Sequence, residues 1–189
     1  MSWHEHIDYI ALKASRRLGL LCRIRKYITI DVCKQLHESL VQPLYEYSDV
    51  VWANTDKSSL DRLFRLQKRG ARIILKRKVR ECSSASLFKE LGWVSLYQRW
   101  EFHKCLTVFR CLNGFCPSYL RKLINLNSEI HNHNTRRRNN IHVNQISSRS
   151  GQRSFSFSAA KLYNDLSNTV KSSKSVRSFT SNYWLERNQ

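Results

Sequence analysis

The chain has 189 residues, with 33 lysines and arginines against 14 aspartates and glutamates, which gives a formal net charge of +19. Hydrophobic residues make up 41% of the chain and aromatic residues 11%, a composition that excludes a low-hydrophobicity disordered tail. Five glycines and two prolines are too few for the many tight turns of a β-sandwich or barrel. We therefore expect a mostly α-helical protein whose partner is a polyanion, nucleic acid being the commonest one.

The cysteines and the first residues of the chain indicate the cellular compartment. The six cysteines, at positions 22, 33, 82, 105, 111 and 116, include no Cys-x-x-Cys pair. Polar and charged residues stand where a signal peptide would have its apolar region, so we expect reduced thiols and not a secreted disulfide framework. No apolar run approaches the roughly 18 residues of a membrane span. The sequence therefore predicts a nuclear or cytoplasmic protein.

Apolar residues recur at helical spacing through most of the first 126 residues. The first predicted helix covers residues 4–26, and a second, capped by Thr29 or Asp31, ends where Pro43 removes a backbone donor. We expect the second helix to bury Val32, Leu36, Leu40 and Val41. The other helices predicted here cover residues 44–52, a long stretch after Ser58 or Ser59, a short stretch ending at Gly92, the stretch from Ser95 to Gly114, and 117–126.

The remainder of the chain changes character. Residues 127–153 are rich in Asn, His, Ser and Arg, which predicts a long polar loop. Residues 154–158 alternate polar and apolar side chains like a short strand, for which residues 141–143 would be the partner. Helices over about 160–166 and 175–186 complete the prediction. We expect a helical domain over 1–126, a basic linker over 127–153, and a C-terminal strand with helices over 154–189.

The long helix after Ser59 carries the strongest functional pattern. At 100° per residue its apolar residues gather on one side, and five basic residues spaced three or four apart gather on the other: Arg62, Arg65, Arg69, Arg72 and Lys76. Seven basic residues and no acidic one lie between positions 68 and 80. Arginines along one helix face can reach successive phosphates, so this stripe is the predicted nucleic-acid contact. The alternative is a solvated helix face.

A second basic cluster lies in the first predicted helix and at its exit. It consists of Arg16, Arg17, Arg23, Arg25 and Lys26, which spread further around the helix and could meet the same nucleic acid. The first three are the further candidate contacts. The basic run over 76–80 is also a candidate nuclear import signal.

Other patterns favour structural roles. His131-Asn132-His133 resembles an HNH nuclease in letters only. Zinc binding is an open alternative for His103, Cys105, Cys111 and Cys116, although Cys105 and Cys111 would point to different helix faces. Aromatic residues at helical spacing are interpreted as core and not as base-stacking platforms: Trp52, Trp93, Tyr97, Trp100 and Phe109. We expect no catalytic residue, metal, cofactor or small-molecule substrate.

Seven segments in order carry a resemblance over nearly the whole chain. The sequence resembles the region that follows the catalytic palm in reverse transcriptases of non-LTR (LINE-type, jockey-like) retrotransposons. The segments are Trp3 with residues 6–28, LVQPLYEYSDVVW (40–52), LDRLFRLQKRGARII (60–74), LFKELGWVSLYQRW (87–100), LNGFCPSYL (112–120), EIHNHNTR (129–136) and RSFSFSAAKLYNDL (153–166).

The resemblance implies a thumb, whose helices lie against a template–primer duplex and hold it without reading its sequence, followed by a basic extension. The implied partners are an RNA–DNA hybrid or a DNA duplex, together with the fingers and palm of a reverse transcriptase. The palm's Tyr-x-Asp-Asp turn binds the two metal ions of nucleotide addition. No Asp-Asp pair occurs here and the chain begins about where the post-palm segment begins, so we expect no polymerase chemistry.

Two departures from the family pattern lie in the tail, where Tyr163-Asn164 replaces the frequent Trp-Asn and Leu166-Ser167 the frequent Leu-Pro. The main alternative function is a stand-alone basic DNA- or RNA-binding protein with a structural or regulatory role. A third class, attachment to an anionic membrane surface through a basic amphipathic helix, would require binding to anionic lipid vesicles. We expect no membrane partner.

Overall fold

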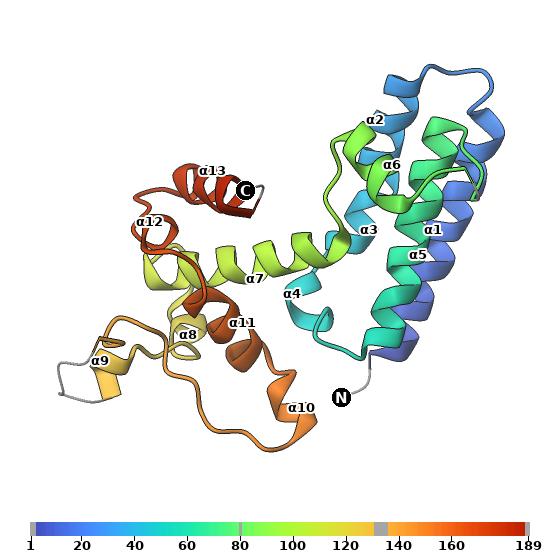
Figure 1. Ribbon diagram of the computed structural model, residues 1–189. Helices are drawn as coiled ribbons and strands as arrows, with labels where there is room; N and C mark the ends of the chain where they lie inside the picture. Colours follow the sequence, from blue (N-terminus) through green and yellow to red (C-terminus); the bar gives the residue numbers. More distant parts are fainter. Residues whose placement is uncertain (1–2, 80, 131–135, 188–189) are drawn as a thin grey trace. The chain divides into compact units, whose positions relative to one another are not determined.

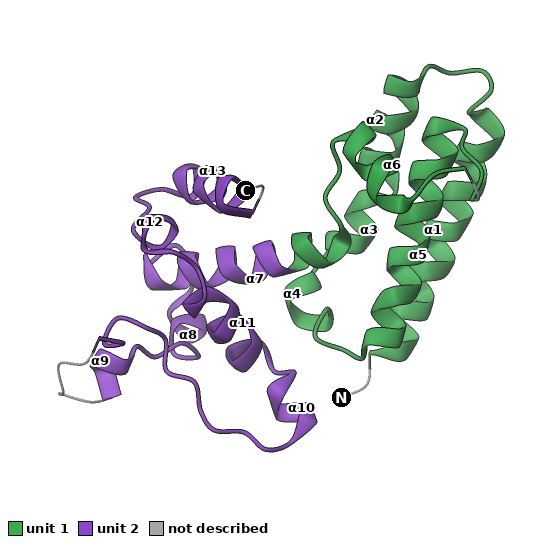
Figure 2. Ribbon diagram, viewed as in Figure 1, with its two compact units in different colours: residues 1–100 green, residues 101–189 purple. Residues whose placement is uncertain are grey.

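The computed structural model describes residues 3–79, 81–130 and 136–187 (Figure 1). In these ranges the protein is all-α, as predicted from its composition, and the only β feature is an isolated antiparallel bridge between Leu126 and Ile141. The chain divides into two compact units, residues 1–100 and 101–189 (Figure 2). This division does not coincide with the boundaries predicted at 126 and 153.

The helices of the first unit follow the predicted order. They are α1 (His4–Ile24), α2 (Ile30–Leu40), α3 (Gln42–Glu46), α4 (Asp49–Trp52), α5 (Lys57–Leu75), α6 (Ser84–Leu91) and the beginning of α7 (Leu96–Leu112). The helix predicted over 44–52 is wrong as a single element, because Ser48 adopts a left-handed backbone conformation, φ 54°, between α3 and α4. The N-cap of α5 is Asp56, which accepts a hydrogen bond from the Ser59 amide at 2.9 Å, so the predicted serine caps are also wrong.

Helices α1 and α5 pack side by side in the same direction. Asp8 pairs with Arg62, and one heptad further along both helices the Arg69 guanidinium donates to the Ser15 hydroxyl at 3.4 Å. The residues buried between them repeat at spacings of three and four, the spacing of a coiled-coil seam. They are Ile7, Ile10, Ala11, Ala14, Leu18 and Leu21 of α1, with Leu60, Leu63, Gln67, Gly70, Ala71 and Ile74 of α5.

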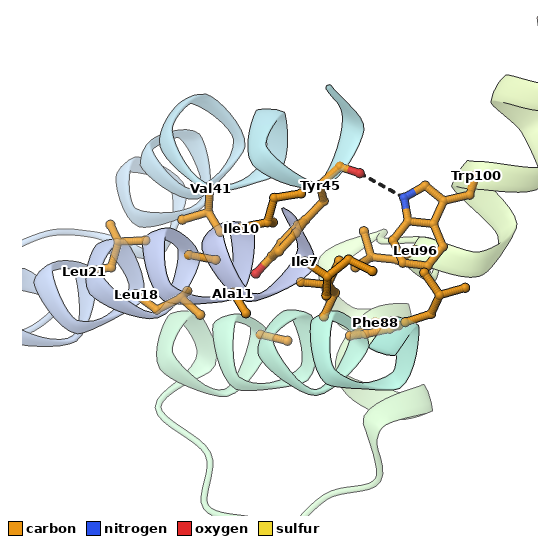
Figure 3. Close-up of a cluster of buried hydrophobic side chains, with 14 of the residues drawn as sticks. Ile7, Ile10, Ala11, Leu18, Leu21, Val41, Tyr45, Phe88, Leu96 and Trp100 are labelled. Atoms are coloured by element: carbon orange, nitrogen blue, oxygen red, sulfur yellow. Dashed lines mark hydrogen bonds between the residues drawn. The ribbon is translucent and has the colours of Figure 1, made fainter. Parts of the chain in front are cut away.

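Aromatic side chains extend this core, as predicted (Figure 3). The Trp100 indole nitrogen donates to the Tyr45 carbonyl oxygen at 2.9 Å, and the Trp52 and Trp100 rings meet edge to face with centroids 5.6 Å apart. Both tryptophans are almost fully buried. They hold α3, α4 and α7 against one another, since an indole ring contributes a large apolar area and its N–H needs one partner.

A buried polar side chain fixes where α7 begins. Gln67 lies in the seam of α5, where its amide nitrogen donates to the Val94 carbonyl at 2.9 Å and its amide oxygen accepts from the Leu96 amide at 3.0 Å. Both ends of the amide are therefore satisfied inside the core, as burial requires. Ser95 and Gln98 complete the start of α7 with a reciprocal capping box.

The buried face of α2 differs from the prediction. Cys33, His37 and Val41 are buried, whereas Val32 and Leu40 are exposed. The helix is rotated because the His37 imidazole packs where Gly70 of α5 has no side chain, and the Trp93 ring covers it at a centroid distance of 4.5 Å. Neither ring nitrogen of His37 has a hydrogen-bond partner among the described residues.

The second unit has its own core. It contains the rest of α7 and the helices α8 (Ser118–Arg121), α9 (Asn127–Ile130), α10 (Arg149–Gln152), α11 (Phe155–Asn164), α12 (Asn168–Lys171) and α13 (Val176–Arg187). Phe102, Cys105 and Phe109 of α7 pack with Tyr163 of α11 and Phe179 of α13. Ile141, in the segment predicted to be a linker, is 3% exposed and belongs to this core.

The predicted strand pair is wrong. Residues 155–158 form the first turn of α11, which Ser154 caps by accepting from the Phe157 amide at 3.4 Å. The alternation of polar and apolar residues over 154–158 is too short to define a period. The buried residues that follow it, Ala159, Ala160 and Tyr163, lie at helical spacing. The Asn164 side chain takes the place of a partner strand, since its amide accepts from the Ile141 N–H at 2.9 Å and donates to the Ile141 carbonyl at 2.8 Å.

We predict that Gly70→Ala destabilises the protein and that Gly19→Ala does not. A Cβ at Gly70 would lie 2.8 Å from His37 Nε2 and 3.3 Å from Leu18 Cδ2, whereas a Cβ at Gly19 meets nothing within 4 Å. Alanine has the better helix propensity at both sites by about 1 kcal/mol, so only the packing differs. Urea unfolding should show a loss of about 1–3 kcal/mol for G70A and a gain for G19A. Equal effects would contradict this packing.

We also predict that His37 makes stability depend on pH. Burial lowers the pKa of His37 to about 4, from an ordinary value of 6.5. The unfolded chain therefore takes up this proton first as the pH falls, so His37 lowers the free energy of unfolding from about pH 6.5 down to pH 4, by about 3 kcal/mol in all. Urea unfolding of wild type and H37L between pH 7.5 and 4.5 checks this. Identical pH profiles for the two proteins would refute it.

Candidate nucleic-acid interface

The five residues of the predicted stripe lie outside the buried face of α5. Arg62, Arg65, Arg69 and Lys76 are exposed, and Arg72 is partly buried. Arg62 forms an ion pair with Asp8 of α1, a counter-charge that lies 54 residues away in sequence. The unbalanced charge of the stripe therefore lies toward the C-terminal end of α5.

An open groove of about 380 Å³ lies at this end of the two parallel helices. Of the nine lining residues that the structure describes, seven are basic: Arg25, Lys26, Arg69, Arg72, Lys76, Arg77 and Lys78, with Cys22 and Ile73 as the others. Because α1 and α5 run in the same direction, their C-terminal carbonyl groups point to the same end, and their partial negative charge attracts basic side chains there. The parallel pairing thus brings Arg25 and Lys26, from the end of one basic cluster, together with the C-terminal part of the stripe.

Lys76 ends α5 in an unusual way. Its backbone is left-handed, φ 53°, and the Arg77 amide bonds to the Arg72 carbonyl at 3.1 Å in a Schellman motif. Gly92 and Gly114 occupy the same position after α6 and α7, with φ of 66° and 75°, and confirm the helix ends predicted at those glycines. A lysine in this conformation costs about 1 kcal/mol relative to glycine, so the residue here carries a charge at the expense of backbone strain.

Arg25 lines the groove and also has a structural role. It is 7% exposed, and its guanidinium donates to the carbonyl oxygens of Ile74 at 2.8 Å and Ile28 at 2.9 Å. The Ile74 carbonyl is in the last turn of α5, whose carbonyl groups have no partner within the helix. Arg25 therefore connects the end of α5 to the end of α1. Its charge still adds to the groove.

The candidates on α1 divide. Arg17 donates to the Leu40 carbonyl and connects α1 with the end of α2. Arg16 and Arg23 are exposed but do not line the groove. Lys26, Arg77 and Lys78, which were not among the predicted site residues, do line it. The basic run over 76–80 drew attention to Arg77 and Lys78 in the sequence. Lys26 lies near them only because α1 and α5 pack in parallel.

The other sequence patterns form no metal centre in residues 3–79, 81–130 and 136–187, where no three His, Cys, Asp or Glu side chains gather. Burial raises the pKa of Cys105 to about 12, and burial with a hydrogen bond to Cys116 raises that of Cys111 to about 12, so both thiols stay protonated. His131 and His133 of the HNH-like pattern, and Arg80 of the basic run, lie outside the described residues.

Comparison of the chain with protein-family models, with curated proteins and with solved structures finds no match. Among the helices that the structure describes, none combines the length and the apolar character needed to cross a membrane.

We predict that Arg25→Met destabilises the protein, whereas Lys26→Met leaves its stability almost unchanged. The first change removes two charge-assisted hydrogen bonds, worth about 3–6 kcal/mol together. Lys26 is exposed, with its ammonium 4.6 Å from the Tyr27 ring centroid, a contact worth about 0.5 kcal/mol. Both variants lose one positive charge, so urea unfolding separates structure from charge. Similar losses for the two variants would contradict the role given to Arg25.

Proposed function

We propose that this chain binds a nucleic-acid duplex without regard to sequence, through the basic groove and the exposed arginines of α5. The observation that carries the proposal is the gathering of seven basic side chains around one open groove, with Glu81 as the sole acidic residue in positions 62–89. A solubilising surface normally mixes charges of both signs.

The chemistry of the groove favours phosphate over base recognition. Guanidinium and ammonium groups attract phosphate oxygens of any sequence, and specific recognition would need side chains placed against base edges. Arg65 and Arg69 lie on one face of α5 and Lys76 directly follows its last residue, so a passing phosphate backbone can meet them in turn. The mode of binding is therefore electrostatic and salt-dependent.

This mode agrees with the resemblance to the region after the palm in reverse transcriptases of non-LTR retrotransposons. We propose that the chain is a thumb and C-terminal part of such an RNA-directed DNA polymerase of a mobile element. In this proposal it holds the template–primer duplex, and the fingers and palm supply the chemistry of nucleotide addition.

We predict that R65A/R69A/R72A flattens the salt dependence of duplex binding. Each lost phosphate contact removes about 0.9 from the slope of log K against log salt, so the slope should fall by about two to three. Fluorescence anisotropy with an RNA–DNA hybrid and a DNA duplex, each in two unrelated sequences, measures it across a salt series.

The matched control is K13A/K57A/K89A, which removes the same charge from the first unit away from the groove. Its slope should stay near that of the wild type. Equal slopes for all three proteins would overturn the proposed interface, and a strong preference for one of the sequences would overturn its sequence independence.

Lys76→Gly gives an independent check, because stability and affinity should change in opposite directions. Glycine relieves the left-handed backbone and should raise the free energy of unfolding by about 1 kcal/mol. The lost charge should weaken duplex binding and reduce the salt slope by about one. A variant that is more stable and binds as well as the wild type would exclude Lys76 from the interface.

A further inference from the structure

A polar pocket of about 450 Å³ lies in the second unit, in the region that the sequence predicted to be a loop. Its walls come from the start of α9, from residues 137–143 and from the end of α11. The lining residues are Asn127, Arg137, Asn140, Ile141, His142, Val143, Lys161, Asn164 and Asp165. None of them belongs to the groove of the first unit.

Two asparagines hold the walls in place. The Asn127 amide nitrogen donates to the Arg137 carbonyl at 2.9 Å, which leaves its amide oxygen to accept from His142 Nδ1 at 3.2 Å. Asn164 makes the two hydrogen bonds to the Ile141 backbone described above. Both sides of the segment that carries Arg137 and His142 are thus fixed by side-chain amides, so the pocket is built by specific contacts and not by a loose loop.

The charge of the pocket favours an anion. Arg137 and Lys161 are exposed, and neither forms an ion pair with a residue that the structure describes. Among the described lining residues Asp165 supplies the single carboxylate, against the two cationic groups of Arg137 and Lys161, so the formal charge of the lining is positive. The second unit as a whole has fourteen basic and four acidic residues.

We propose that this pocket binds the phosphate group of a nucleotide. The cationic groups of Arg137 and Lys161 would contact the phosphate oxygens, and the amide-rich wall with Val143 suits a polar heterocycle. The volume exceeds what a lone phosphate ion would fill and lies in the range of small-molecule sites. The phosphate can come from a free mononucleotide or from the end of a strand. The proposal stands on the second unit alone and does not depend on duplex binding by the first.

The test is titration of the full chain with adenosine 5′-monophosphate. Adenosine, which lacks the phosphate, and inorganic phosphate, which lacks the nucleoside, are titrated for comparison. NMR signals of the His142 ring report binding at the site. We expect the monophosphate to bind, adenosine to bind at least tenfold more weakly, and R137Q/K161Q to weaken monophosphate binding at least tenfold. Equal binding of adenosine, or no shift of the His142 signals, would overturn the proposal.

The matched control is R149Q/R153Q, which removes two exposed arginines of the same unit outside the pocket and should change the affinity less than twofold. An equal loss in the control would mean diffuse attraction and would overturn the site. Competition by a short oligothymidine, with and without a 5′-phosphate, distinguishes the two sources of the phosphate. If only the phosphorylated strand displaces the bound monophosphate, the site binds a strand end. If neither strand displaces it, the site binds a free mononucleotide.

R65A/R69A/R72A should retain monophosphate binding, and R137Q/K161Q should retain the salt slope of duplex binding if the two sites are separate. Thermal unfolding of each variant verifies the fold, since Arg137 and Lys161 are exposed and their loss should leave the core intact. Loss of monophosphate binding in the α5 variant would assign the nucleotide to the groove and would overturn the pocket.

Discussion

The first unit depends on the close, parallel packing of α1 against α5. The seam repeats every seven residues, and its tightest point is Gly70, where the absence of a side chain admits the His37 ring from α2. This one contact sets the rotation of α2, and with it the burial of Cys33 in place of Val32 and Leu40 of the predicted apolar face. Gln67, three residues earlier in the seam, sets the start of α7 through two backbone hydrogen bonds. A glycine and two polar residues thus determine how the apolar helices fit together.

The same packing explains the distribution of charge. In an antiparallel pair the basic ends of α1 and α5 would lie at opposite ends of the seam. The parallel arrangement places them together, so that Lys26 and Lys76 line one groove and the Arg25 guanidinium bonds to the last turn of α5. The attraction between basic side chains and helix C-termini offsets part of their mutual repulsion. In the proposed function, a bound polyanion would remove the rest of that repulsion.

Helical periodicity predicted much of this fold because, in a long amphipathic helix, the spacing of the apolar residues identifies the buried face. The bounds of α1 and α13 and the outward face of α5 follow from spacing, and those of α6 from spacing with its Ser83 and Gly92 caps. Two of the errors fall where a polar residue occupies the core, as His37 does, and where a side chain replaces backbone pairing, as Asn164 does. Neither leaves a trace in the apolar pattern. The groove and the second-unit pocket could not be predicted because each joins segments distant in sequence, and only tertiary contacts bring these segments together.

The parallel direction of α1 and α5 also bears on how the first unit folds. Residues that face each other across the seam, such as Asp8 and Arg62, are separated by 54 positions, and the intervening chain must return along the whole length of α1 before α5 can begin. Closing a loop of this size costs roughly 3–4 kcal/mol of chain entropy before contacts between α1 and α5 begin to stabilise the unit. Local helix formation cannot supply the missing stability. The α1–α5 seam is therefore a long-range contact, which slows folding, and α2 reaches its final orientation only when His37 meets Gly70 of α5.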